Sequence, residues 1–254
     1  MDLIQALAAE LGKDPRHVEN VVHLLDEGNT IPFIARYRKE LHGAMDDTSL
    51  RTLEERLQYL RGLEERREAV KKSIDEQGKL TDELAAAIDS AKTLAEVEDL
   101  YRPYKQKRRT RATMAKEKGL EPLAALLFAQ ERDCPRPEEA ARAFVDPEKG
   151  VETVEDALQG ASDIIAEQIS DDASIRKSLR ALIFRQGQLV SRAATEDDSV
   201  YRLYYDFTQS VARLQGHQVL AINRGEKEGI LKVTVALDRE QALPLLRRAV
   251  VKPG

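Results

Sequence analysis

One stretch of the chain carries enough positive charge to bind phosphate groups. Residues 101–120 read YRPYKQKRRTRATMAKEKGL, with eight basic residues against one acidic residue, Glu117, and a local formal charge of +7. The whole chain has 40 basic and 45 acidic residues, so its formal net charge is −5. Lysine and arginine neutralise backbone phosphates and bind them without reading the base sequence. The stretch therefore predicts a sequence-independent contact with RNA or DNA.

Five cations and one tyrosine would make this contact. Tyrosines flank the cluster, and an aromatic ring can stack on an exposed base. The predicted nucleic-acid-binding residues are Lys105, Lys107, Arg108, Arg109, Arg111 and Tyr104. The alternative is a solvated loop that pairs with acidic residues of the same chain, such as those at 64–68 or 96–99. Because no base-reading pattern surrounds the cluster, the sequence leaves both alternatives open.

A second, smaller basic group ends the third predicted helix. Arg36, Arg38 and Lys39 follow the apolar run IPFI at residues 31–34. A recognition helix would direct such side chains into a groove of DNA. The apolar run instead favours a buried helix, with Arg36 paired to neighbouring carboxylates. We therefore keep these three residues as secondary candidates.

The remaining reactive residue types do not form a catalytic pattern. Carboxylate pairs at 46–47, 171–172 and 197–198 stand at predicted helix starts or in loops, where capping accounts for them. The four histidines lack metal-ligand spacing, and Cys134 is the single cysteine. The segment GEKEG (225–229) lacks the Lys-Ser/Thr ending of a phosphate-binding loop. We predict a non-catalytic protein with no metal and no cofactor.

Helices must position these residues, because helical periodicity dominates the first 220 residues. We predict three short helices within residues 1–45, in a helix-turn-helix-like outline, and then a long spine helix at 47–77. Further helices are predicted at 82–91, 94–101, from 112, around 123–128, and at 137–144, 153–169, 171–186, 200–213 and just after Gly216.

One strand interrupts this pattern near the C-terminus. Residues 230–235 alternate as a strand does, and they either pair with a weak strand at 188–193 or lack a partner. The predicted fold class is mainly α, a multi-helix assembly with one short β element. The predicted parts are 1–45, 46–215 and 216–254.

The cysteine count and the apolar pattern predict the compartment of the protein. With one cysteine it cannot form an internal disulfide, which favours a reducing compartment. The N-terminus lacks the basic and apolar regions of a signal peptide, and no apolar run is long enough for a bilayer. We predict a cytoplasmic protein without a membrane partner, and favour a monomer.

Three segments resemble the N-terminal region of the bacterial transcription accessory protein family Tex. They are TIPFIARYRKELHGAMDD (30–47), VEDLYRPYKQKRRTRATMAKEKGLEPLA (97–124) and LAINRGEKEGIL (220–231). The resemblance implies a mostly helical region that precedes an RNase H-like domain, a helix-hairpin-helix domain and an OB-fold RNA-binding domain. It also implies a role in transcription and nucleic-acid binding, with the family's RNA contacts in the OB-fold. We expect a fragment that ends where the RNase H-like domain would follow.

Two functions are compatible with these observations. The first is a non-catalytic helical scaffold that binds RNA or DNA backbones within a Tex-like transcription accessory factor. The alternative is a protein-docking module that contacts the transcription machinery or the rest of its own longer chain.

Overall fold

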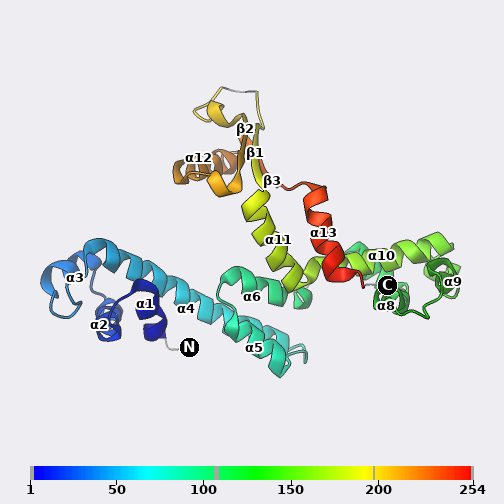
Figure 1. Ribbon diagram of the computed structural model, residues 1–254, viewed down its shortest axis with the longest axis horizontal. Coiled ribbons are helices and arrows are strands. Elements are labelled where there is room, and N and C mark those ends of the chain that lie inside the picture. Colours follow the sequence, from blue (N-terminus) through cyan, green and yellow to red (C-terminus); the bar gives the residue numbers. More distant parts are fainter. Residues whose placement is uncertain (1–2, 106–108, 197, 253–254) are drawn as a thin grey trace. The chain divides into compact units, whose positions relative to one another are not determined.

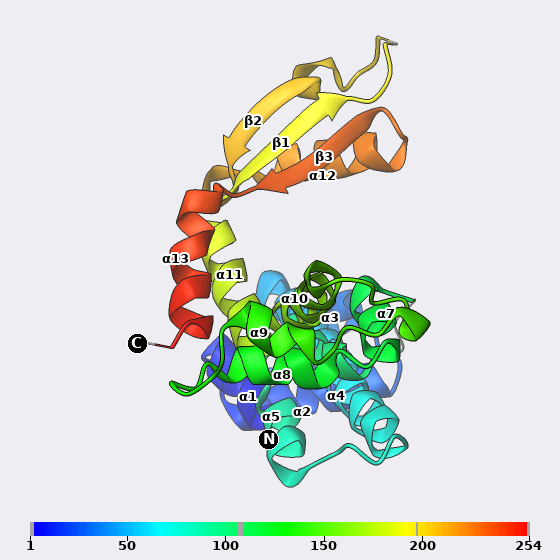
Figure 2. The ribbon, with the colours of Figure 1, turned by 90° about the vertical axis from the view of Figure 1, so that its right-hand side faces the viewer.

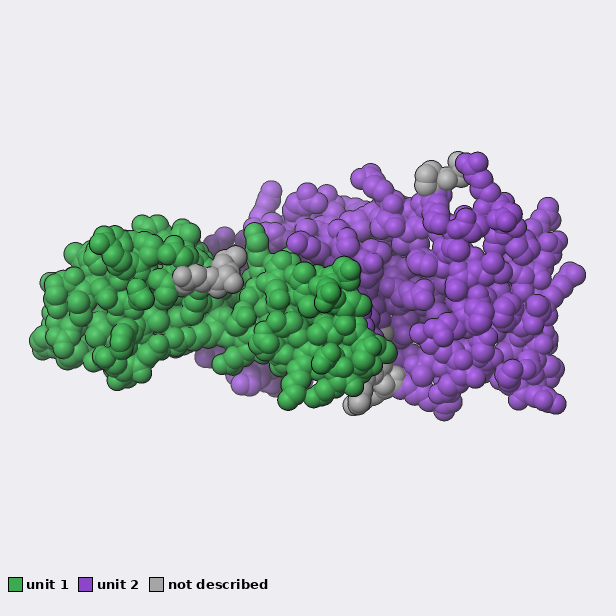
Figure 3. Space-filling model, turned by 90° about the horizontal axis from the view of Figure 1, so that it is seen from below, with its two compact units in different colours: residues 1–98 green, residues 99–254 purple. Residues whose placement is uncertain are grey.

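The computed structural model describes residues 3–105, 109–196 and 198–252. The chain divides into two compact units, residues 1–98 and residues 99–254 (Figure 3). The described residues form thirteen α-helices and one three-stranded antiparallel sheet (Figure 1). The predicted mainly α fold is confirmed. None of the helices in these ranges combines the length and the apolar composition that a membrane crossing requires.

Unit 1 starts with three short helices that pack on the first half of a long one. They are α1 (Leu3–Leu11), α2 (Pro15–Asp26) and α3 (Ile31–Tyr37), and the long helix is α4 (Asp47–Asp75). Their shared core is aliphatic and fully buried at Leu7, Val18, Ile34, Leu50 and Leu53. The predicted spine helix is thus present and ends two residues before the predicted end. The helix-turn-helix-like character of residues 1–45 stays a prediction.

The second half of α4 is covered by α5 (Asp82–Ser90) and the segment after it. Apolar residues at three- and four-residue steps remain buried along α4 as far as Val70 and Ile74. Polar bonds add to this packing. Arg67 donates to the carbonyl oxygen of Ala91, and the Lys71 ammonium lies 2.8 Å from an Asp89 carboxylate oxygen. These contacts hold the chain that leads into α6 (Leu94–Tyr101).

The helical part of unit 2 is built around α10 (Val154–Asp171). Around it lie the 3₁₀ turn η1 (Arg102–Tyr104), α7 (Arg111–Glu117), α8 (Glu121–Ala129), α9 (Pro137–Arg142) and α11 (Ala173–Gln186). The 3₁₀ turn η2 (Pro147–Lys149) follows α9 in the chain. Small residues on α10 allow a close approach of α7. A Cβ atom at Gly160 would lie 2.3 Å from a methyl carbon of Leu120 and 3.2 Å from the Cβ of Ala115. A larger side chain at position 160 must therefore displace the buried Leu120 side chain.

A small sheet follows α11. Its strands are β1 (Gln188–Ala193), β2 (Asp206–Ser210) and β3 (Leu231–Ala236), in the order β2-β1-β3, both pairs antiparallel. Val190 of β1 lies opposite Thr234 of β3, so the predicted strand pairs with residues 188–193. Helix α12 (Gly216–Lys227) packs against β3 and covers one face of the sheet (Figure 2). Helix α13 (Arg239–Val250), which the sequence analysis did not anticipate, then packs on α11.

The predicted helix at 200–213 is wrong. These residues form a 3₁₀ turn, η3 (Arg202–Tyr204), then strand β2, then a second turn, η4 (Val211–Arg213). Phe207 pairs with Ser191 on the edge of β1 that β3 leaves open. Aromatic residues favour a half-buried pleated surface, and that tertiary pairing overrides a weak helical pattern.

The contact at Gly160 gives a stability prediction. Replacement Gly160→Val should lower the free energy of unfolding by about 1–3 kcal/mol, because the side chain has no room against Leu120. Urea unfolding followed by circular dichroism measures it. The matched control is Gly62→Val on α4, where a Cβ would meet no described atom within 4 Å apart from its chain neighbours and the backbone of its own helix. It should change stability by less than about 0.5 kcal/mol. Equal effects of the two substitutions would contradict this account of the α7–α10 contact.

Candidate nucleic-acid interface

The basic segment, defined as residues 101–118, begins at a fixed point of unit 2. Arg102, at the start of η1, donates from Nε to a carboxylate oxygen of Asp171, 2.8 Å away. Asp171 is buried at the end of α10. Arg102 is thus a structural anchor, although it belongs to the same run of basic residues as the predicted phosphate ligands.

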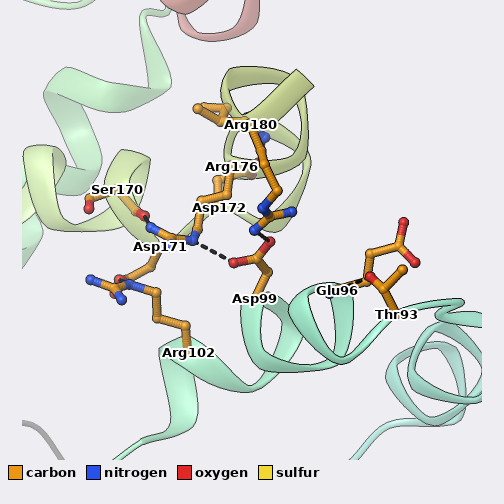
Figure 4. Close-up of polar contacts among 10 residues, drawn as sticks. Thr93, Glu96, Asp99, Arg102, Ser170, Asp171, Asp172, Arg176 and Arg180 are labelled. Atoms are coloured by element: carbon orange, nitrogen blue, oxygen red, sulfur yellow. Dashed lines mark hydrogen bonds and ion pairs between the residues drawn. The ribbon is translucent and has the colours of Figure 1, made fainter. Parts of the chain in front are cut away.

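A second carboxylate beside this anchor is held by two arginines (Figure 4). Asp99, with a side chain only 5% exposed, accepts from Arg176 Nε at 2.6 Å and from Arg180 Nη2 at 2.5 Å. Burial raises the pKa of Asp99, but the hydrogen bonds from Arg180 and Arg176 outweigh it and hold the pKa below its ordinary value. The end of α6 is therefore tied to the first turns of α11.

The outer part of the basic segment is exposed. The Lys105 ammonium lies 5.3 Å from the centre of the Tyr101 ring, and Tyr104 is half-buried. The guanidinium of Arg109 lies 2.9 Å from a carboxylate oxygen of Glu117. Arg111 is exposed at the first position of α7, and no residue within the described ranges forms an ion pair with it. Lys107 and Arg108 lie outside the described residues.

Several basic residues of this stretch therefore pair with acidic residues of the same chain, as the loop alternative predicted. Arg102, Arg109 and Lys116 form ion pairs with Asp171, Glu117 and Glu121, rather than with residues 64–68 or 96–99. Further along, the Lys118 ammonium donates to the carbonyl oxygen of Gly150.

These contacts differ in strength. The Arg109 and Glu117 side chains are 70% and 53% exposed, and such surface pairs contribute about 0–1 kcal/mol. Arg109 can therefore exchange a carboxylate for a phosphate at little cost. Arg102 cannot, because its departure would leave the carboxylate of Asp171 buried and without this partner. Among the described residues, the predicted ligands that remain on an accessible surface are Lys105, Arg109 and Arg111.

The secondary candidates lie on the surface of unit 1. The helix α3 is anchored through buried Ile31 and Ile34, as its apolar run predicted. Its arginines stack on rings: Arg36 lies 5.9 Å from the centre of Tyr37, and Arg38 lies 5.5 Å from that of Phe33. No carboxylate of the described residues forms an ion pair with Arg36, so that part of the prediction is wrong. Lys39 is exposed.

The paired carboxylates have structural roles where they are described. Asp46 caps α4 by accepting from the Ser49 amide, and Asp172 caps α11 by accepting from that of Ile175. Asp198 is exposed and pairs weakly with Arg202 at 3.5 Å, while Asp197 lies outside the described residues. Within the described part of the chain, no three His, Cys, Asp or Glu residues form a group that could hold a metal ion.

The contacts of Asp99 were not predicted from the sequence. Its two partners lie 77 and 81 residues further along the chain, and no local pattern reports such a contact. The sequence does indicate, however, that the two arginines can bind one partner together. Arg176 and Arg180 are four residues apart on a helix, which places both guanidinium groups on one face.

Comparison with known proteins gives the family. Residues 1–75 match the model of the Tex-like protein N-terminal domain, and residues 133–250 match that of the Tex central region. The chain belongs to the Tex family. The predicted membership of this family is thereby confirmed, and two of the three resembling segments, 30–47 and 220–231, lie within the matched ranges.

Named relatives cover most of this Tex-family chain. It is 46% identical over 254 residues to the uncharacterized protein YdcI of Bacillus subtilis, covering 98% of this chain and 35% of the relative. Identity to the transcriptional accessory protein Tex of Neisseria gonorrhoeae is 42% over 240 residues, covering 92% of this chain and 31% of the relative. The S1 RNA-binding domain-containing protein 1 of Homo sapiens is 31% identical over 245 residues, covering 92% of this chain and 24% of the relative. The chain spans about a third or less of these relatives' length.

The Asp99 contact predicts a pH-dependent contribution to stability. Replacement Asp99→Asn should lower the free energy of unfolding at neutral pH by about 1–3 kcal/mol, because two guanidinium groups lose their charged acceptor. Since the folded-state pKa of Asp99 is lowered, its contribution is full above the ordinary carboxyl pKa and is lost as the pH falls through the folded-state value. Urea unfolding at neutral pH and at stepwise lower pH measures both effects.

Asp198→Asn is the control, because that carboxylate is exposed and only weakly paired. It should leave stability within about 0.5 kcal/mol at every pH. A difference between the wild type and Asp99→Asn that grows as the pH falls would contradict the assignment.

Proposed function

We propose that this Tex-family region is a non-catalytic helical scaffold that binds RNA or DNA backbones without sequence preference. The basic segment makes the contact. The observation that carries the proposal is the exposure of Lys105, Arg109 and Arg111 on a segment that is fixed at both ends. Arg102 fixes its start to Asp171, and packing of α7 on α10 fixes its end.

Fixed ends favour binding because less conformational freedom is lost when the ligand arrives. Neutralised phosphates release their counterions, so each arginine or lysine adds affinity that depends on salt. Lys107 and Arg108 add two more charges from the same segment. Tyr104 supplies a ring beside the cations on which a base can stack.

The relatives' names supply a context for the proposal. One is a transcriptional accessory protein, and another carries an S1 RNA-binding domain by name. We propose the same setting for this chain: nucleic acid as ligand, the transcription machinery as partner, the cytoplasm as location and a monomer as the binding species. Arg36, Arg38 and Lys39 are a secondary contact in this proposal.

Protein docking is the second candidate function, and one observation favours it. Val200 and Leu203, in the connection between β1 and β2, are 88% and 84% exposed. Apolar side chains grouped on a surface are typical of protein contacts. A docking module would use this connection and would not need the basic segment.

Charge reversal on the basic segment tests the proposed function. We expect Arg109→Glu/Arg111→Glu to weaken binding of a labelled oligonucleotide about tenfold or more, and to lower the slope of log Kd against log salt concentration by about 2. Fluorescence anisotropy of the chain with single- and double-stranded oligonucleotides measures both quantities. A glutamate at the first position of α7 suits the helix dipole, so folding should be kept.

The matched control is Arg132→Glu/Arg136→Glu, in the exposed connector before α9, which changes the net charge equally. Equal weakening by the two pairs would overturn the assignment to the basic segment. Absence of oligonucleotide binding at low salt, together with binding of purified RNA polymerase that is lost in Val200→Ser/Leu203→Ser, would favour the docking function.

A further inference from the structure

Helix α11 is a second concentration of positive charge, outside the basic segment. Its sequence ASIRKSLRALIFRQ holds four basic residues and no acidic residue. The helix α13, which packs along it in both ribbon views (Figures 1 and 2), carries Arg247 and Arg248 in its last turn. The two helices leave a groove on each side of their contact, and the two grooves differ in chemistry.

The arginines that line the first groove already stabilise the fold. It has a volume of about 570 Å³ and is lined by Arg176, Arg180 and aliphatic side chains, including Leu179 and Leu246. Both arginines already bind the buried carboxylate of Asp99. Their charge is therefore not available to a ligand without breaking that contact.

The second groove, on the opposite side, has a volume of about 510 Å³. Serines 174 and 178 lie one helical turn apart on α11, and Arg185 lies two turns further on the same face. Arg248 enters from α13. Both arginines are exposed, and neither forms an ion pair with any residue that the structure describes.

We propose that this second groove binds the phosphodiester backbone of a nucleic acid. Arg185 and Arg248 approach it from different helices, and each guanidinium presents paired N–H donors that match phosphate oxygens. Ser174 and Ser178 offer hydroxyl donors of the kind that contact phosphates. Ala181 and Ala249 complete the lining with small side chains, so a backbone can approach the helices closely.

The lining favours nucleic acid over protein as the occupant. Protein interfaces are usually anchored by large apolar or aromatic side chains that fill pockets. The large apolar residues of this groove are Ile175, which is buried, and Leu245, which is half-buried. What remains accessible is cationic and hydroxylic, which is complementary to a polyanion. The inference rests on the proposed function for its ligand, but it uses none of the residues of the basic segment, so charge reversal at each site tests the two separately.

Charge reversal at the groove tests the inference on the whole 254-residue chain. We expect Arg185→Glu/Arg248→Glu to weaken binding of a mixed-sequence oligonucleotide about tenfold, and to lower the slope of log Kd against log salt concentration by about 2. The matched control is Arg142→Glu/Arg213→Glu, two exposed arginines on α9 and η4 without an ion pair among the described residues. The control should leave the slope unchanged.

Circular dichroism establishes that both variants keep their helices. If charge reversal unfolds the chain, the variant Arg185→Gln/Arg248→Gln is used in its place. It should weaken oligonucleotide binding about threefold, and it should also lower the slope of log Kd against log salt concentration. A Kd and a slope that match those of the control would overturn the inference and leave the groove to an acidic protein surface. Absence of oligonucleotide binding by the wild-type chain at about 50 mM salt would overturn it as well.

Discussion

The ion pairing of one buried carboxylate organises unit 2. Asp99 lies in the last turn of α6 and is held by Arg176 and Arg180 of α11, two parts of the chain that are far apart in sequence. A buried charge is costly unless its partners satisfy it, so this geometry is strongly specified once the chain folds. The neighbouring pair of Arg102 with Asp171 uses the same junction between α10 and α11. The basic segment therefore starts from a defined position.

This constraint divides the positive charge of unit 2 into two classes. Arg102, Arg176 and Arg180 point to buried carboxylates and serve the fold. Arg111, Arg185 and Arg248 are exposed and have no ion-pair partner among the described residues. Arginines of the two classes lie close together in the sequence. Counting charges along the sequence therefore does not distinguish the structural arginines from the exposed ones. The division explains how a chain with net negative charge presents local surfaces that suit a polyanion.

Local signals predicted much of the fold. Asp14 followed by Pro15 marks the start of α2, and Thr153 with Asp156 forms a capping box at α10. These features act within one helical turn, which is why a single sequence reports them. Strand β3 was also predictable, because its alternation is local, and its pairing with residues 188–193 was one of the two stated alternatives.

Long-range contacts account for what the sequence did not show. Strand β2 exists because Phe207 and its neighbours pair with β1, and the tyrosine-rich stretch before it carried no sign of that edge. The partners of Asp99 and the second groove both depend on which face of α11 meets α6 and α13. Of the predicted site, Lys105, Arg109 and Arg111 are placed on the surface, whereas Arg102 in the same run is structural.

The dependence of nucleic-acid affinity on salt tests the central claim most directly. The chain is titrated into two labelled RNAs of equal length and unrelated sequence, from about 50 to 300 mM salt. The account predicts equal affinities for the two RNAs and a linear fall of log affinity with log salt concentration. The magnitude of that slope should be about 0.7 per phosphate contacted. Affinity that differs between the sequences, that is insensitive to salt, or that is absent at the lowest salt would contradict it.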